Sequence, residues 1–366
     1  MTTSENLATP SGSAAATRAS LVMGPTNTAG QGFQWTQALT RFRGVEAISL
    51  SGAIGQARKI SGPAHRRVPH HRIRPLAATA AWTKRLLRGR SHLIDESMVA
   101  ILGDPRTTDF AAEVPQLQDM GLTLGVVFHG SDIRDPDRHM SRLPFSYFAS
   151  ASDDFVDRMR RSTAARHAAC DALGLPTFVS TPDLLLDVPD ATWLPVVVDT
   201  TLWASDRPVL SAATPRVMHI PSRRDPPIKG TAHIDPVLRR LESEGLIEYI
   251  SPTMVPHEQM PSLVGGVDVV VDQIMSGFAG VAAAEGMAAG RLVVGYIAPD
   301  VRAVMPTASP VVDAPPEEFE ATMRRILAER ETFVDIAALG PGYVDEVHSG
   351  RLSADVLADF MDLPSG

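Results

Sequence analysis

Short apolar runs alternate along the chain with longer stretches in which apolar residues recur every three or four positions. The first run, 21–23, ends in the glycine-bearing loop GPTNTAGQG, and Phe33, Trp35, Leu39 and Phe42 then follow at helical spacing. The same pattern predicts further strands and helices, the strands at 45–50, 92–94, 122–128, 177–180 and 193–198 and the helices at 109–120 and 153–173. Strands that alternate with helices are typical of βαβ units, so we expect a largely parallel sheet.

A second series of the same kind follows. It is predicted to contain strands at 216–220, 247–251, 267–271 and 292–297, and helices at 232–245 and 281–289. The intervening stretch, 199–215, is rich in Asp, Thr, Ser and Pro and has weak periodicity. We therefore place the connection between two domains in this stretch.

The expected fold class is α/β, with an N-terminal doubly wound domain over 19–200 and a C-terminal one over 201–366. Ligands of such folds bind outside the carboxyl ends of the strands, so two facing domains predict a central cleft. The last helix of the chain could pack back on the N-terminal domain. Residues 1–18 are small and polar without periodicity, and we expect a disordered tail because they offer little apolar area to bury.

Composition narrows the function classes. No run reaches the roughly 20 apolar residues that a membrane-spanning helix needs, and the first residues lack the apolar core of a secretory signal, so a cytoplasmic location is expected. The single cysteine, Cys170, excludes a disulfide scaffold and a multi-cysteine metal site. The formal net charge of −8 argues against a general nucleic-acid binder.

The net charge hides one strongly basic segment. Residues 57–92 contain ten Lys and Arg and no Asp or Glu, so this segment carries +10 and the rest of the chain −18. Its later part, AATAAWTKRLLRGR, places Trp82 and two leucines beside basic residues, as in an amphipathic helix that lies on an anionic membrane. A solvated basic face that packs a few apolar residues inward explains the pattern equally well.

The nearly all-apolar stretch VAAAEGMAAG carries one charged residue, Glu285. A buried carboxylate needs a protein cation or ligand hydroxyls as partners, whereas a glutamate that reaches the surface needs neither. The preceding strand runs into Asp272 and Gln273, and the small-residue loop up to Gly280 then delivers backbone N–H groups to a helix N-terminus. Such an arrangement binds anions through aligned amides and the helix dipole. A phosphate there would leave Glu285 near a ribose.

Five blocks of the chain share their order and spacing with a known family: GPTNTAGQGFQW, VVFHGSDIRDP, VSTPDLL, PSRRDPPIKGT and VDVVVDQIMSGFAGVAAAEGMAAGRLVVGYI. Together they resemble the retaining, GT-B-fold glycosyltransferases of the bacterial "glycosyl transferases group 1" kind. The resemblance covers about residues 20–300. It implies two facing Rossmann-like domains, the N-terminal one for the acceptor and the C-terminal one for the donor. It also implies that the nucleotide-diphosphate sugar is a substrate, with no cofactor and no metal ion.

The resemblance assigns roles to several residues. Lys229 is the lysine that contacts the donor pyrophosphate, and either Arg223 or Arg224 is its companion. Fixed cations there stabilise the negative charge that leaves with the nucleotide diphosphate. Glu285 holds the ribose. His129, at the end of a predicted strand, lies beside the transferred sugar, although a lone histidine at a strand end is more often structural.

Five residues are expected on the acceptor side. Asn27, Gly30 and Gln31 shape the first glycine-bearing loop opposite the donor site. Asp132 and Arg134 follow His129 closely and either contact the acceptor or fix their own loop.

One position departs from the family pattern. The family commonly has a pair of glutamates with seven residues between them, the first on the sugar and the second on the ribose. Counting back from Glu285 places the first at Gly277, and Ser276 beside it is no carboxylate either. Gly277 then offers the donor only its backbone, and Asp272 or Gln273 contacts the sugar instead.

The function expected is a metal-independent, retaining hexosyltransferase of polysaccharide or cell-envelope biosynthesis. It moves a sugar from a nucleotide-diphosphate donor to a glycan, lipid-linked or small-molecule acceptor, by front-face substitution without a protein nucleophile. The alternative, motivated by the missing glutamate, is a catalytically degenerate sugar-nucleotide or polysaccharide-binding protein; nucleotide-sugar epimerisation is a third. The expected location is cytoplasmic, with peripheral contact to the anionic inner membrane face through residues 57–92 as an open alternative, and no nucleic-acid partner is expected.

Overall fold

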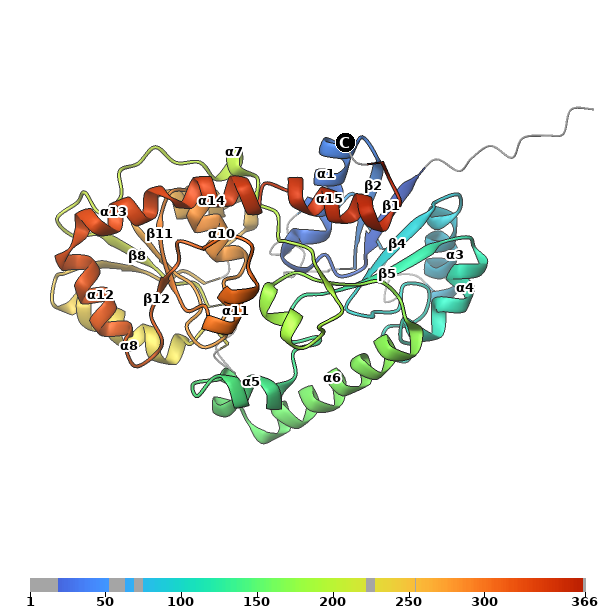
Figure 1. Ribbon diagram of the computed structural model, residues 1–366, viewed down its shortest axis with the longest axis horizontal. Coiled ribbons are helices and arrows are strands. Elements are labelled where there is room, and N and C mark those ends of the chain that lie inside the picture. The colour runs from blue at the N-terminus through green and yellow to red at the C-terminus, as the bar shows by residue number, and fades with distance from the viewer. Residues whose placement is uncertain (1–18, 53–62, 69–74, 222–227, 254, 365–366) are drawn as a thin grey trace, which may run out of the picture.

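The computed structural model describes residues 19–52, 63–68, 75–221, 228–253 and 255–364. Within these ranges the chain forms two α/β units side by side, each built on its own sheet (Figure 1). We call them the N-terminal unit and the C-terminal unit. The tail expected at 1–18 lies outside the described residues, and so does part of the basic segment.

The N-terminal unit is built on seven parallel strands in the order β3-β2-β1-β4-β5-β6-β7. Its strands are β1, Ser20–Gly24; β2, Glu46–Ser51; β3, Arg66–Arg67; β4, His92–Glu96; β5, Thr123–Phe128; β6, Thr177–Val179; and β7, Thr192–Trp193. Its α-helices are α1, Gln31–Arg43; α3, Leu76–Leu87; α4, Val114–Asp119; α5, Pro136–Arg142; and α6, Asp153–Leu173. Short 3-10 helices are η1, Thr28–Gly30; η2, Ala111–Glu113; η3, Tyr147–Ser150; and η4, Pro182–Leu186.

The C-terminal unit is built on five parallel strands in the order β12-β11-β10-β8-β9. Its strands are β8, Arg216–Met218; β9, Glu248–Ile250; β10, Val269–Val271; β11, Leu292–Gly295; and β12, Val312–Asp313. The helices from the connection onward are α7, Thr200–Trp203; α8, Thr231–Ser243; η5, His257–Gln259; α9, Met260–Gly265; α10, Val281–Ala288; α11, Pro299–Val304; α12, Phe319–Ala328; α13, Arg330–Ala338; α14, Gly340–Val347; and α15, Arg351–Phe360.

The central strands are apolar at successive positions because both faces of each sheet are covered. In β10, Val269 and Val271 face one buried cluster and Val270 faces another. In β1, Leu21 and Met23 pack beside Trp35, whereas Val22 packs on the opposite face. Each sheet therefore separates two apolar layers, and the predicted parallel α/β architecture is confirmed.

Two segments cross between the units. The last helix, α15, packs along α1 of the N-terminal unit, and Arg43 forms an ion pair with Asp355 at 2.7 Å (Figure 1). In the other direction, Tyr147, Phe148 and Phe155 belong to the apolar cluster that lies under the second sheet. These crossings join the two units by buried apolar contacts.

Two predicted elements are wrong in extent. The strand expected at 193–198 ends at Trp193, because the following residues leave the sheet and run between the units, where Trp35 Nε1 donates to the carbonyl of Pro195 at 2.7 Å. The helix expected at 109–120 begins later, with η2 and α4, because Asp109 forms an antiparallel bridge with Val99. Tertiary pairing overrides the local pattern in both cases.

None of the helices in the described ranges combines the length and the apolar character that crossing a bilayer requires.

Candidate functional site

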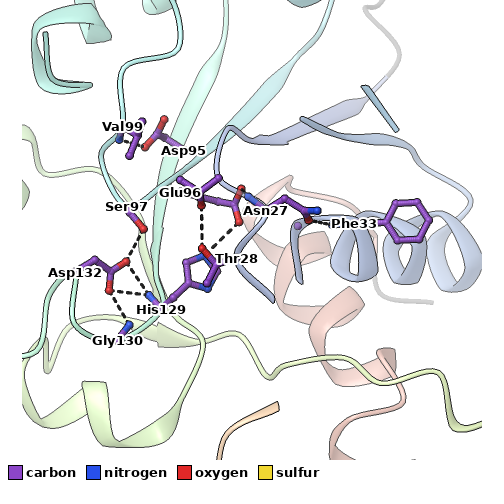
Figure 2. A network of polar contacts seen from close by, with 12 residues as sticks. Asn27, Thr28, Phe33, Asp95, Glu96, Ser97, Val99, His129, Gly130 and Asp132 are labelled. Carbon is purple, nitrogen blue, oxygen red and sulfur yellow. Dashed lines mark hydrogen bonds and ion pairs between the residues drawn. The ribbon is translucent and has the colours of Figure 1, made fainter. Parts of the chain in front are cut away.

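Two buried polar side chains meet at the carboxyl ends of neighbouring strands in the N-terminal unit (Figure 2). Glu96 ends β4, and His129 follows β5 directly. His129 Nε2 lies 3.2 Å from Glu96 Oε1, and the backbone N–H of Asn27 donates to Glu96 Oε2 at 2.6 Å. A carboxylate accepts hydrogen bonds, so in this contact Nε2 of His129 carries the proton. The side chain of His129 is 8% exposed and that of Glu96 is 0% exposed. We call these two residues the Glu96–His129 pair.

The loop after β5 holds His129 in place. The Asp132 carboxylate accepts from the N–H of His129 at 3.0 Å and from that of Gly130 at 2.6 Å, and it also accepts the Ser97 hydroxyl at 2.5 Å (Figure 2). The indole of Trp35 stacks on the His129 ring with centroids 5.6 Å apart. Asp132 was expected either to contact the acceptor or to fix its own loop. Its hydrogen bonds in the structure are of the second kind.

The loop between β1 and α1 wraps around Glu96. Asn27 adopts a left-handed conformation, φ 51°, and its side-chain oxygen accepts the N–H of Phe33 at 2.9 Å. A Cβ at Gly32 would lie 3.3 Å from both Glu96 oxygens, so the backbone passes against the carboxylate. Ala29, φ 49°, and Gly30, φ 75°, are also left-handed just before α1. The glycine-bearing loop thus places the backbone of Asn27 and Gly32 beside Glu96.

Gln31 has a different environment from the one expected on the acceptor side. It is 2% exposed, its amide donates to the carbonyl of Val197 at 3.2 Å, and its oxygen accepts the Val197 N–H at 2.7 Å. Both ends of the amide are bonded to the segment that runs between the units. Its acceptor role stays a prediction.

Glu96 and its neighbour Asp95 were missed at the sequence level. The stretch HLIDES ends a strand in two carboxylates, which was the available signal. Burial raises the pKa of Asp95 well above its usual value, although the N–H of Val99 donates to it at 3.0 Å. Asp95 therefore accompanies Glu96 as a second buried acid at the end of β4.

A second polar cluster lies at the carboxyl end of β10 in the C-terminal unit. Lys229 Nζ lies 2.9 Å from Asp272 Oδ1, with side chains 15% and 3% exposed. The N–H of Gly280, at the start of α10, donates to Asp272 Oδ2 at 3.3 Å. The carbonyl of Lys229 also accepts the N–H of Ile274 at 3.1 Å, which ties the lysine to the β10–α10 loop, residues 272–280.

Glu285 joins this cluster from α10 and is half-buried. Burial raises its pKa to about 8, Lys229 lowers this pKa by its positive charge, and Asp272 raises it by like-charge repulsion. The sequence expectation of a glutamate in need of a partner agrees with these surroundings. Lys229, Asp272 and Glu285 form what we call the lysine cluster.

The raised pKa of Glu285 predicts a pH-dependent stability. The unfolded chain releases this proton near 4.5 and the folded chain near 8, so the folded state binds more protons in between and its unfolding free energy falls as pH rises through this window. In Glu285→Gln, the decrease of the unfolding free energy across this window should be smaller than in the wild type by about 1–3 kcal/mol. This range allows for the partial solvent access of the side chain. Urea unfolding at both ends of the window, with exposed Glu331→Gln as control, measures it. Parallel wild-type and Glu285→Gln curves would contradict the assignment.

Beneath the lysine cluster, His219 is a structural residue that was not predicted. It is fully buried, with Nδ1 2.9 Å from the carbonyl of Val271 and Nε2 2.9 Å from the Thr231 hydroxyl. Because the carbonyl only accepts, Nδ1 carries the proton and Nε2 accepts from Thr231. Burial lowers the pKa of His219 to about 4, so the ring is neutral and connects β8, β10 and α8.

The β10–α10 loop is packed against the N-terminal unit. His139 of α5 is buried, and its Nε2 donates to the carbonyl of Ser276 at 3.2 Å, while burial lowers its pKa to about 3. The Arg134 guanidinium lies 4.5 Å above the Phe278 ring and is bonded to Asp183 at 2.6 Å. Loops at the carboxyl ends of β5 and β10 therefore meet. Like Asp132, Arg134 shows loop-fixing contacts.

Gln273 and Gly277 lie where the family pattern would place a sugar-binding carboxylate or its substitute. The Gln273 amide donates to the carbonyl of Phe278 at 2.9 Å, within its own loop. Gly277 adopts φ 73°, and a Cβ there would lie 2.8 Å from Leu143 Cδ1. A side chain at 277 therefore requires a left-handed backbone and a shift of the Leu143 side chain.

Gly277→Ala is expected to lower the free energy of unfolding by about 1–3 kcal/mol, through backbone strain and the clash with Leu143. Leu143→Ala combined with Gly277→Ala should relieve the steric part of this loss and leave the strain. Denaturation of the wild type, both single variants and the double variant gives the coupling energy. Wild-type stability in Gly277→Ala would refute this explanation of the departure.

The two candidate companion arginines, Arg223 and Arg224, lie outside the described residues. The structure thus brings Lys229, Asp272, Gly280 and Glu285 together in the lysine cluster. It brings His129 and Asp132 together in the N-terminal unit, and Glu96 links His129 to Asn27, whose carbonyl accepts the N–H of Gly30 at 3.0 Å. Among the described residues, no group of three or more His, Cys, Asp or Glu is arranged to hold a metal ion.

No protein-family model and no curated protein matches the sequence. Solved structures match nearly the whole chain. HepE (Alr3699) of Anabaena in complex with UDP and glucose aligns with TM-score 0.62 at 11% identity, over 94% of this chain and 99% of that one. Sucrose-phosphate synthase of Thermosynechococcus elongatus gives 0.58 at 13% identity, over 94% and 98%. A glycosyltransferase of Rickettsia africae gives 0.56 at 12% identity, over 94% and 97%.

At these identities the likeness establishes the fold. The two facing sheets have the GT-B arrangement of these glycosyltransferase structures, and the fold that the sequence resemblance implied is confirmed.

Proposed function

We propose that the protein transfers a sugar from a nucleotide-diphosphate donor to an acceptor hydroxyl. The observation that carries the proposal is the lysine cluster, in which Lys229 and Glu285 lie at the carboxyl end of β10 beside the N-terminus of α10. HepE, which shares the fold over nearly its full length, is described in complex with UDP and glucose. The resemblance of the β10–α10 sequence to donor-binding segments supports the same conclusion.

On this proposal the lysine cluster binds the donor diphosphate. Lys229, now paired with Asp272 at 2.9 Å, turns to the phosphates, and the backbone of Gly277 and Gly280 adds N–H groups at the positive end of α10. Arg223 or Arg224 adds a second cation. Glu285 accepts hydrogen bonds from the ribose hydroxyls, and Asp272 or Gln273 contacts the sugar in place of the missing glutamate.

The chemical step proposed is retaining and needs no metal ion. The bond from the anomeric carbon to the diphosphate oxygen breaks, the acceptor oxygen bonds to the same face of that carbon, and the acceptor proton passes to the leaving phosphate. Lys229 and its companion arginine stabilise the charge that develops on the diphosphate. His129, oriented by Glu96, hydrogen-bonds to the transferred sugar.

The acceptor proposed is a glycan, a lipid-linked molecule or a small molecule bound by the N-terminal unit. Asn27, Gly30, Gln31, Asp132 and Arg134 would shape its site, and contact with an anionic membrane through residues 57–92 would serve a lipid-linked acceptor. The glycosyltransferases that share the fold include S. aureus TarM, described with UDP and α-GlcNAc-glycerol.

The donor half of this proposal is tested by calorimetric titration with UDP, GDP and ADP. Binding of one nucleoside diphosphate supports it, and absence of binding by all three, at low salt and with a folded protein, refutes it. A binding protein without transfer is the second candidate function, favoured by the lack of a carboxylate at Gly277. Turnover separates the two, since only a transferase releases nucleoside diphosphate from a donor sugar in the presence of an acceptor.

A further inference from the structure

A pocket of about 630 Å³ lies in the N-terminal unit, between α3 and the outer strands of the sheet. Side chains from β2, β3 and α3 and from the turn after α3 line it, among them Ile48, Arg66, Trp82, Arg85, Leu86 and Arg88. Of the six Lys and Arg residues of the basic segment that lie within the described ranges, four line this pocket: Arg66, Arg85, Arg88 and Arg90. The proposed transfer reaction does not use it.

The pocket has a surplus of positive charge. Among the described residues that line it, Glu46 is the one acid, and its carboxylate is already paired with Arg90 at 2.6 Å. Arg85 and Arg88 are exposed and form no ion pair within the described part of the chain. Arg66 donates to the carbonyl of His65 at 2.9 Å and forms no ion pair within the described ranges. Three guanidinium groups that no described carboxylate pairs with thus border one hollow.

Apolar side chains share the same pocket. Ile48 and Leu86 are half-buried beside the half-buried Trp82. Low-dielectric walls around like charges focus the electrostatic potential and concentrate counter-ions. A ligand that fits both features carries an anion for the arginines and an apolar part for Ile48, Trp82 and Leu86. A guanidinium group can donate two parallel hydrogen bonds to two oxygens of one phosphate, so arginines bind phosphate better than they bind a group with one acceptor atom.

The pocket is separate from the Glu96–His129 pair. Ser20 and Glu46, the first residues of β1 and β2, line it, so it opens toward the amino ends of these strands. Glu96 and His129 lie at the opposite, carboxyl ends of β4 and β5. A strand of five residues such as β1 separates the two ends by about 13 Å.

We propose that this pocket is a second ligand site, which binds a phosphate monoester or diphosphate group joined to an apolar part. The arginines Arg66, Arg85 and Arg88 hold the phosphate, and Trp82 contacts the apolar part. The proposal does not depend on the proposed transferase function. The same chemistry occurs in a lipid phosphate and in a soluble organic phosphate, and the probes below distinguish these sources.

Binding is measured by tryptophan fluorescence. The signal of Trp82 is the part of the ligand-induced change that is absent in the variant Trp82→Phe. Three probes are titrated at low salt: inorganic phosphate, monomeric dihexanoyl phosphatidic acid, and phosphatidylcholine vesicles with or without phosphatidic acid. We expect saturable binding of the short-chain phosphatidic acid, with competition by inorganic phosphate. Arg85→Gln with Arg88→Gln should weaken it at least about tenfold, because two charge-assisted contacts are lost. The matched control is Arg158→Gln with Arg161→Gln, two exposed arginines on α6.

The outcomes are decisive in either direction. Equal binding of inorganic phosphate and the short-chain lipid would overturn the proposal, because the apolar side chains then add nothing. Binding of the short-chain lipid and of the phosphatidic-acid vesicles identifies a lipid source, and binding of the short-chain lipid without the vesicles identifies a soluble organic phosphate. In either case binding persists in Lys229→Ala, which separates this pocket from the donor site. The proposal is overturned if neither soluble probe binds, if the double variant binds as tightly as the wild type, or if only vesicles bind, since that indicates a flat basic surface.

Discussion

Lys229→Ala is expected to weaken nucleoside-diphosphate binding about ten- to a hundredfold, the loss of one charge-assisted contact, and to lower turnover further. Lys229 lies just before α8, 2.9 Å from Asp272, and its charge opposes the burial that raises the pKa of Glu285. Without it, the leaving diphosphate loses a fixed positive charge in the transition state. Calorimetry and steady-state kinetics with the preferred donor measure both effects.

Loss of the lysine also leaves the carboxylate of Asp272 buried and unpaired, at 3% exposure, which destabilises the fold. Lys229→Met combined with Asp272→Asn removes both charges and separates the two effects. If this double variant is folded and still binds nucleotide as the wild type does, the lysine cluster is not the diphosphate site.

His129→Ala is expected to lower turnover roughly a hundredfold to a thousandfold, as loss of one preorganised polar contact at a reaction centre does, while nucleotide affinity is unchanged. His129 lies in the N-terminal unit, away from the lysine cluster, and its Nε2 is held by Glu96 at 3.2 Å. Glu96→Gln should have a smaller effect of the same kind, because Glu96 acts by orienting His129.

Stopped-time assays of nucleoside-diphosphate release, with nucleotide affinity measured in parallel, test this division between binding and turnover. The exposed His233 provides the control variant, His233→Ala. If His129→Ala reduces nucleotide affinity as strongly as it reduces turnover, the pair belongs to binding and not to the reaction centre. If turnover is unchanged, His129 has a structural role.

Much of the fold could be predicted from the sequence because it depends on local pattern. Strands buried on both faces, such as β5 and β10, stand out as continuous apolar runs between helical stretches, and their alternation indicates parallel sheets. Asp272 and Glu285 were equally visible, since they flank a glycine-bearing loop and lie within about one element of each other. Lys229, several elements earlier in the chain, was named through the family resemblance.

The rest depends on contacts between distant segments. Glu96 became a candidate only when β4 was seen to lie beside β5, which brings His129 within 3.2 Å. The contact that a side chain at 277 would make with Leu143 involves a residue more than a hundred positions earlier. Tyr147 and Phe148 of the N-terminal unit pack in the cluster under the second sheet, a contact that local sequence pattern cannot show.

The central claim, sugar transfer from a nucleotide diphosphate, is tested most directly by incubating the protein with a panel of UDP-, GDP- and ADP-sugars, with and without a cell-lipid extract. Release of nucleoside diphosphate is then measured. We expect one donor to give release that depends on the extract and is lost in both Lys229→Ala and His129→Ala. Absence of release from every donor, or release that persists in both variants, would contradict the assignment.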